Sequence, residues 1–250
     1  MILSHGRREV SYPCSIVGQD NTSYTPRILQ GGVDMQITIR EPGSAITHFI
    51  GMIMALFAAV PLLVKAGLSS GALSLGAMTV FMVSMILLYG ASATYHSVNL
   101  TGKALRVFRK LDHMMIFVLI AGSYTPVCLI VLGGSLGYAL LALVWGIALA
   151  GMIVKACWIT CPKWFSSIIY IAMGWVCVLV FGRLLDTLSP SGFLWLLAGG
   201  ILYTVGGVVY ALKLPIFNSR HKEFGSHEVF HLFVMAGSIC HFIFMYTYVA

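Results

Sequence analysis

The residues of this sequence whose types and spacing could do chemistry are mostly histidines. His227 and His231 are four residues apart, which places both on one face of a helix. Two such imidazoles can clamp a metal ion, and a third from another helix, His96, would leave a tetrahedral zinc with one open position. Histidines also lie at the ends of membrane helices without a metal, and an HxxxH pair arises easily by chance. The pattern alone leaves both interpretations open.

The same segment, residues 227–231, also spells HExxH, the pattern of zinc metalloproteases. In those enzymes the glutamate, here Glu228, acts as the general base. Such a site commonly needs an acid as a further ligand, and Asp186 is expected at the outer end of its own span. Asp112 and His96 are both available as third ligands. An intramembrane metalloprotease is therefore a competing interpretation.

The elements that must position these residues are membrane helices. Of 250 residues, 59% are hydrophobic and 9% are charged, whereas soluble proteins carry about 25% charge. This composition excludes an ordinary water-soluble enzyme. Apolar segments of bilayer-spanning length recur from Glu41 onward. The sequence predicts an all-α polytopic membrane protein with seven transmembrane helices, over residues 45–66, 73–98, 111–132, 136–157, 164–185, 193–212 and 227–249.

Basic residues set the predicted orientation. With the N-terminus in the cytoplasm, all of the 15 Lys and Arg residues except Lys65 and Arg183 fall in cytoplasmic segments. The positive-inside rule therefore predicts a cytoplasmic N-terminus and an external C-terminus. The net charge of +7 reflects topology, and no nucleic-acid partner is expected. Residues 1–40 are expected to form a flexible cytoplasmic extension without a signal peptide, before a seven-helix domain over residues 41–250.

Polar residues from several predicted helices fall at one membrane depth, near the cytoplasmic boundary. They are His48 in the first span, Ser92 and His96 in the second, Asp112 in the third, and His227 and His231 in the seventh. Ionisable groups in a membrane are costly and mark functional sites. His113 is expected to point about 100° away from its neighbour Asp112. His241 lies about 15 Å deeper than His231, alone, and is expected to be a packed or hydrogen-bonded core histidine.

The ordered motifs resemble those of the bacterial hemolysin III proteins, which belong with the progestin and adipoQ receptor family of seven-helix proteins. The motifs are Glu41-Pro-Gly-Ser-Ala-Ile-Thr-His48, Ser92-x3-His96, Leu-Asp112-His-Met, Gly-Ser-Tyr-Thr-Pro over residues 122–126, and His227-x3-His231 followed by Leu-Phe-Val-Met-Ala-Gly-Ser. The resemblance covers about residues 38–249. Residues 1–37 have no counterpart in it.

The resemblance implies a zinc ion held by His96, His227 and His231 near the cytoplasmic face. It further implies that Asp112 bonds to water at the metal and that Ser92 is close by. Glu228 is not part of the implied ligand set, which counts against the protease interpretation. The family is similar to membrane hydrolases that include alkaline ceramidases, and it is associated with cytolysis and with lipid homeostasis. A bacterial cytoplasmic membrane is the expected location.

The leading hypothesis is a zinc-dependent hydrolase of a lipid amide or ester that enters from the inner leaflet. Asp112 would act as the base, Ser92 would bond the water or the oxyanion, and membrane lipids would be the partners. Glu41 and His48 would lie behind the metal ligands, or would simply satisfy the start of the first helix. The alternatives are a non-enzymatic membrane sensor with structural zinc, and a cytolytic pore, against which no polar stripe runs from face to face.

Six scattered cysteines are interpreted as small apolar residues. Cys157 and Cys161 are spaced so that they could share a metal, but no second pair lies nearby in the sequence. A thiolate metal site is therefore the less favoured interpretation of these two residues.

Overall fold

A computed structural model describes residues 39–69, 71–212 and 224–250, so the predicted extension lies outside the described residues except for its last two. Over these ranges the chain forms seven apolar helical spans and no strand, as the sequence predicts. The elements are α1 (Pro42–Ser69), α2 (Gly71–Ser97), α3 (Gly102–Pro126) with the π-helix η1 (Val127–Leu132), α4 (Gly134–Cys157), α5 (Lys163–Gly174) with the 3-10 segment η2 (Trp175–Val180) and α6 (Phe181–Thr187), α7 (Pro190–Leu212), and α9 (Ser226–Phe244) with the π-helix η3 (Met245–Val249).

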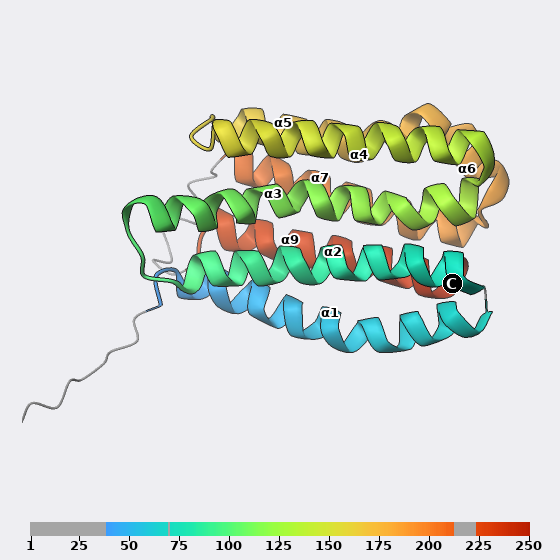
Figure 1. Cartoon of the computed structure of the whole chain (residues 1–250), viewed down its shortest axis with the longest axis horizontal. Helices are drawn as coiled ribbons and strands as arrows, with labels where there is room; N and C mark the ends of the chain where they lie inside the picture. Colours follow the sequence, from blue (N-terminus) through green and yellow to red (C-terminus); the bar gives the residue numbers. More distant parts are fainter. Residues whose placement is uncertain (1–38, 70, 213–223) are drawn as a thin grey trace, which may run out of the picture. The chain divides into compact units, whose positions relative to one another are not determined.

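The helices form a bundle in which the last span returns to the first (Figure 1). Packing runs from α1 to α2, α3 and α4 along the chain, and α5 packs against α7. The final helix, α9, packs against both α7 and α1. The beginnings of α1, α3 and α9 and the end of α2 consequently meet at one end of the bundle. This closure collects polar residues that are far apart in the sequence.

The bundle is apolar on its surface as well as in its core. Phe81 and Phe117 are fully buried between helices, whereas Phe57, Leu68 and Leu179 are largely exposed on the outside. Exposed apolar side chains are expected where the surrounding solvent is lipid, because lipid tails are as apolar as the core. The exposed surface therefore fits a membrane environment.

In a membrane, helices cannot associate by burying apolar surface away from water, so close packing between them holds the bundle together. A Cβ atom added at Gly122 of α3 would lie 2.1 Å from Oγ of Ser84 on α2. Such a contact is impossible, so only glycine permits the observed separation of these two helices. Small residues at helix contacts are typical of membrane bundles.

One predicted boundary is wrong. The sequence predicts that the third span begins at residue 111, but α3 begins at Gly102, about two and a half turns earlier. The first turns carry Lys103, Arg106 and Arg109. Hydropathy marks only the part of a helix that lies in hydrocarbon, and the helix continues past it because its backbone groups stay hydrogen-bonded. Asp112 thus lies within the helix and not at its start.

Candidate metal centre

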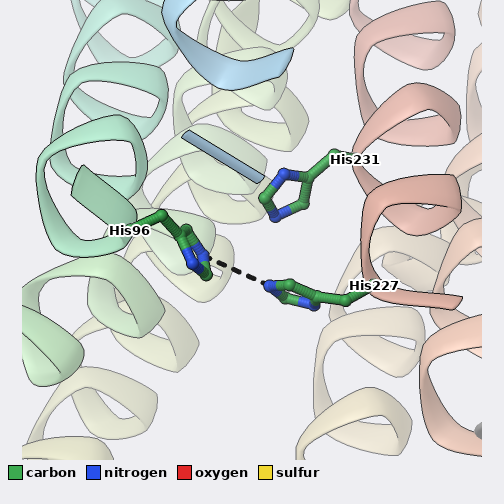
Figure 2. A group of neighbouring side chains, drawn as sticks. All are labelled: His96, His227 and His231. Carbon is green, nitrogen blue, oxygen red and sulfur yellow. Dashed lines mark hydrogen bonds between the residues drawn. The ribbon is translucent and has the colours of Figure 1, made fainter. Parts of the chain in front are cut away.

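Three histidines from two helices converge at the end of the bundle where α9 begins. His96 lies in the last turn of α2, and His227 and His231 lie in the first turns of α9 (Figure 2). One ring nitrogen from each lies within 4.8 Å of the other two. No other group of three possible ligands occurs among the described residues. The spacing of four residues does place both α9 histidines toward His96, as the sequence predicts.

The distance between two of these rings suits a shared metal ion. Nε2 of His227 lies 3.2 Å from Nε2 of His96. Two nitrogens bound to one tetrahedral zinc are about 3.3 Å apart, given metal–nitrogen bonds near 2.0–2.1 Å. Three neutral imidazoles are also a donor set that zinc accepts in catalytic sites. The residues present therefore fit a zinc ion.

Glu41, which directly precedes α1, supports His96 from behind. Its Oε2 lies 2.5 Å from Nδ1 of His96, and its backbone N–H donates to the His96 carbonyl over 3.0 Å. The hydrogen bond with His96 holds the pKa of the Glu41 carboxyl below its usual value. An imidazole that donates through Nδ1 presents an unprotonated Nε2 to a metal. Glu41 therefore contacts His96 through both its side chain and its backbone.

Arg40 holds the other side of the same carboxylate. Its Nη2 lies 3.2 Å from Oε1 of Glu41, and its guanidinium lies 4.2 Å from the ring centre of Tyr95. Tyr95 is the residue before His96 in α2. The segment before α1 is thereby fastened to the end of α2 on both sides of the ligand.

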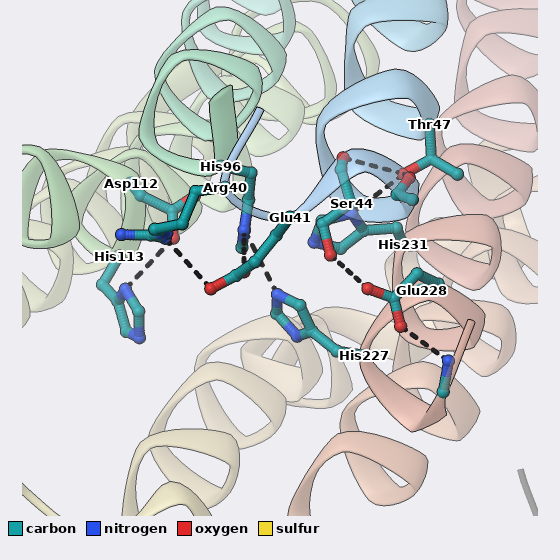
Figure 3. A network of polar contacts seen from close by, with 12 residues as sticks. Arg40, Glu41, Ser44, Thr47, His96, Asp112, His113, His227, Glu228 and His231 are labelled. Atoms are coloured by element: carbon teal, nitrogen blue, oxygen red, sulfur yellow. Dashed lines mark hydrogen bonds and ion pairs between the residues drawn. The ribbon is translucent and has the colours of Figure 1, made fainter. Parts of the chain in front are cut away.

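Thr47 supports His231 in the same way, and sequence reasoning missed it. Its Oγ1 lies 3.1 Å from Nδ1 of His231 (Figure 3). The Thr47 hydroxyl also reaches the carbonyls of Gly43 and Ser44, at 3.0 and 2.9 Å. Because its proton goes to a carbonyl, its lone pairs accept the N–H of His231. A polar residue in the first turns of an apolar span, next to His48, was the available signal.

His48 contacts the histidine cluster by stacking and not by hydrogen bonding. Its ring stacks on that of His231, with centroids 3.5 Å apart and an interplanar angle of 10°. The Tyr89 ring packs edge-on against the His48 ring, with ring centroids 5.1 Å apart. Neither nitrogen of His48 has a hydrogen-bond partner among the described residues. His48 therefore fixes the plane of His231 by packing.

The HExxH glutamate is turned away from the histidines. Glu228 accepts a hydrogen bond from the Ser44 hydroxyl through Oε1 and one from the Gly225 backbone through Oε2, at 2.7 Å for the latter (Figure 3). The second bond caps the beginning of α9. Because both carboxylate oxygens hold α9 in place, Glu228 is not arranged as the general base of a metalloprotease.

Asp112 and Ser92 line a cavity that is shared with His48, His227 and His231. Ser92 is 1% exposed, and its Oγ has no hydrogen-bond partner among the described residues. Oδ2 of Asp112 lies 3.2 Å from Nδ1 of His113, so the expectation that His113 points away is wrong. The backbone directions do differ, but the His113 side chain folds back along α3, where Nδ1 also lies 3.0 Å from the Arg109 carbonyl.

The rest of the cavity wall is mostly apolar and follows the membrane-spanning direction of α9. Its wall includes Leu88, Ile116, Leu119 and Val234, and it reaches His241. From His231 to His241 a helix rises about 15 Å. The cavity therefore extends from a polar end, at His227 and His231, along a mostly apolar body.

Comparison with known proteins places the chain in a family. The family model described as Haemolysin-III related matches residues 36–242. The chain is 39% identical over 214 residues to Hemolysin-3 of Bacillus cereus, with 86% of this chain and 94% of that protein covered. It is 38% identical over 206 residues to the Hemolysin-3 homolog of Bacillus subtilis (strain 168), with 82% and 92% covered.

A more distant similarity extends to eukaryotic receptors. The Adiponectin receptor protein of Drosophila melanogaster is 22% identical over 237 residues, with 81% of this chain and 49% of that protein covered. The order of the histidine motifs and these similarities indicate the same family. The chain therefore belongs to the hemolysin III family of bacterial multi-pass membrane proteins, within the progestin and adipoQ receptor superfamily.

Proposed function

We propose that this protein is a zinc-dependent hydrolase of a lipid amide or ester, acting at the cytoplasmic leaflet and serving membrane lipid homeostasis. One observation carries the proposal: two of the three clustered histidines, His227 and His231, line a cavity together with the Asp112 carboxylate and with Ser92, whose hydroxyl has no hydrogen-bond partner among the described residues. A purely structural zinc site commonly has four protein ligands. Three ligands beside a cavity leave a position for chemistry.

His96, His227 and His231 would hold the zinc. When bound, zinc acts as a Lewis acid that polarises a carbonyl group and acidifies water. Asp112 takes the proton of the attacking water, while its contact with His113 keeps the carboxylate in place. The Ser92 hydroxyl donates a hydrogen bond to the carbonyl oxygen as negative charge develops there. The apolar body of the cavity holds a hydrocarbon chain, so membrane lipids are the partners that we propose.

The second candidate is a non-enzymatic membrane sensor. The observation in its favour is that the site fastens three helices together: α2 and α9 supply the ligands, and α1 supplies the stacking ring of His48. In that case zinc would be structural, and Asp112 would matter little for function. A cytolytic pore is less favoured, because the cavity wall is mostly apolar, whereas a conducting path needs polar side chains along its whole length.

The test uses the full chain, purified in mild detergent. Zinc is measured by elemental analysis, and hydrolysis is measured on a fluorescent ceramide and a fluorescent phospholipid. We expect about one zinc per chain and turnover of one substrate class. His227→Ala loses zinc and turnover together. Asp112→Asn keeps the zinc and loses turnover by a factor of about 10²–10⁴, the usual contribution of a general base.

Two results would change the proposal. Undiminished turnover in Asp112→Asn would remove the base assignment. Stoichiometric zinc without turnover of either lipid, in wild type and variants alike, would favour the sensor.

A further inference from the structure

A buried lysine far from the histidines needs a negative partner. Lys155 lies in the last turn of α4 and is 2% exposed. A buried ammonium is costly unless it is paired and hydrogen-bonded. Within the described ranges no carboxylate forms an ion pair with it. The side chains that Nζ contacts are Cys161, at 3.1 Å from Sγ, and Ser166, at 2.5 Å from Oγ.

The Cys161 sulfur is surrounded by donors. It receives the Lys155 ammonium and lies 3.3 Å from the Ser166 hydroxyl. Ser166 accepts from Lys155, so its own proton goes to the sulfur or to the Pro162 carbonyl. Donors aimed at sulfur stabilise the thiolate and not the thiol. Lys155 requires a negatively charged partner, and these donors favour a negative charge on the Cys161 sulfur.

The other groups facing Cys161 support this assignment. Arg109 of α3 contributes a further positive charge, while Tyr170 of α5 and Tyr210 of α7 contribute neutral hydroxyls. Burial alone would raise the pKa of the Cys161 thiol, but the hydrogen bonds from Ser166 and Lys155 and the two nearby cations lower it below the usual value. Cys161 lies in the connection between α4 and α5, outside the spans.

We propose that Cys161 is a thiolate paired with the buried Lys155 ammonium, and that this pair is a reaction site for hydroperoxides, separate from the metal centre. The sulfur attacks the peroxide oxygen, so an S–O bond forms as the O–O bond breaks. Sulfur loses two electrons and becomes a sulfenic acid, and the leaving oxygen takes a proton from water. The product no longer carries the negative charge that Lys155 needs.

Tyr170 links the Lys155–Cys161 pair to the wall of the lipid cavity. Nζ of Lys155 lies 5.8 Å from the ring centre of Tyr170, which lines the cavity and donates its hydroxyl to the His113 carbonyl over 3.0 Å. A Lys155 ammonium that has lost its thiolate must seek another partner. Oxidation at Cys161 therefore disturbs a cavity wall that also holds the residue beside Asp112.

The first experiment measures the protonation of Cys161 directly. The full chain in detergent micelles is alkylated with iodoacetamide between pH 5.5 and 9.5, and the Cys161 and Cys157 peptides are quantified by mass spectrometry. Cys157 is exposed and serves as the internal control. We expect the midpoint of the Cys161 rate to lie at least one pH unit below that of Cys157. The midpoint reports protonation whatever the access to the sulfur.

Variants at Lys155 test the partner. Lys155→Met should raise the Cys161 midpoint by one pH unit or more, whereas Lys155→Arg, which keeps the charge, should leave it low. If Lys155→Met does not fold, Ser166→Ala should shift the midpoint the same way by a smaller amount. A Cys161 midpoint at or above that of Cys157, or one that neither substitution moves, overturns the ion pair.

The second experiment measures the reaction. The protein is treated with hydrogen peroxide at pH 7 and the sulfenic acid is trapped with dimedone. We expect about tenfold more adduct on Cys161 than on Cys157, since one pH unit changes the thiolate fraction of a mostly protonated thiol tenfold. In the Cys161→Ser variant, Cys157 should be the one residue of the segment between α4 and α5 and its flanks that carries a dimedone adduct. An unlabelled Cys161 whose alkylation midpoint is low overturns the assignment as a peroxide site.

Discussion

Two buried histidines of α9, one near its beginning and one in its last turn, differ in what surrounds them. His231 meets two other histidines, the Thr47 hydroxyl and the stacked ring of His48. His241 meets the Leu196 carbonyl, at 3.3 Å from Nε2, and the edge of the Tyr203 ring. Both rings are buried in the same helix and border the same cavity.

The difference teaches that burial of a histidine does not by itself indicate a metal site. At His231, Nδ1 donates a hydrogen bond to the Thr47 hydroxyl, and the ring lies beside the imidazoles of His96 and His227. Around His241, a carbonyl takes the proton and the ring fills the space left by Gly199. The expectation that His241 is a hydrogen-bonded core residue is confirmed. What separates a ligand from a core residue is the convergence of other ligands.

The largest effect should separate these two histidines. We expect His231→Ala to lose bound zinc completely, because two remaining imidazoles cannot complete the site. His241→Ala should keep about one zinc per chain, although it leaves a void in the core. Elemental analysis of both purified variants beside wild type checks this. Equal loss of metal in both would mean that the comparison is wrong.

The supports of the ligands should have the next largest effect. Glu41→Ala and Thr47→Val each remove the acceptor that orients a ligand, and removal of such partners typically weakens metal binding about 10–100-fold. Competition with a calibrated zinc chelator measures the loss. Ser44→Ala is the matched control, because its side chain bonds Glu228 and not a ligand. Affinities unchanged in Glu41→Ala would show that the hydrogen bond to His96 is dispensable.

A smaller effect, on stability alone, should follow from filling the niche of His241. A Cβ at Gly199 would lie 2.1 Å from Cδ2 of His241, whereas one at Gly200 would meet nothing within 4 Å. Gly199→Ala should lower the free energy of unfolding by about 1–3 kcal/mol, the usual cost of overpacking. Gly200→Ala should not. Thermal unfolding in detergent compares them, and zinc content should stay at the wild-type level in both.

The smallest effect is expected at Glu228. Glu228→Gln keeps the side-chain shape but removes the charge and one of the two acceptor oxygens at the beginning of α9, which should cost about 1 kcal/mol, the usual value of one hydrogen bond. Zinc content and turnover should be unchanged. A metalloprotease with Glu228 as base would instead lose its activity, so retained lipid hydrolysis in this variant separates the two chemistries.

Much of the fold and part of the site could be predicted from local patterns. Apolar runs predicted seven spans because each helix must present hydrocarbon-compatible side chains over its own length. The spacing of His227 and His231 predicted a shared face because that depends on one helix alone. The boundary of α3 was misjudged, since Gly102–Lys110 is helical without being apolar.

The sequence by itself determined the class, the number of spans and the three histidines, because composition, period and motif are properties of single segments. Only the tertiary structure decided the partners: Thr47 behind His231, Ser44 on Glu228, and Lys155 on Cys161. The first two pairs join α1 to α9, which are at opposite ends of the chain. Their rotation and depth follow from how whole helices pack, and no local pattern specifies that.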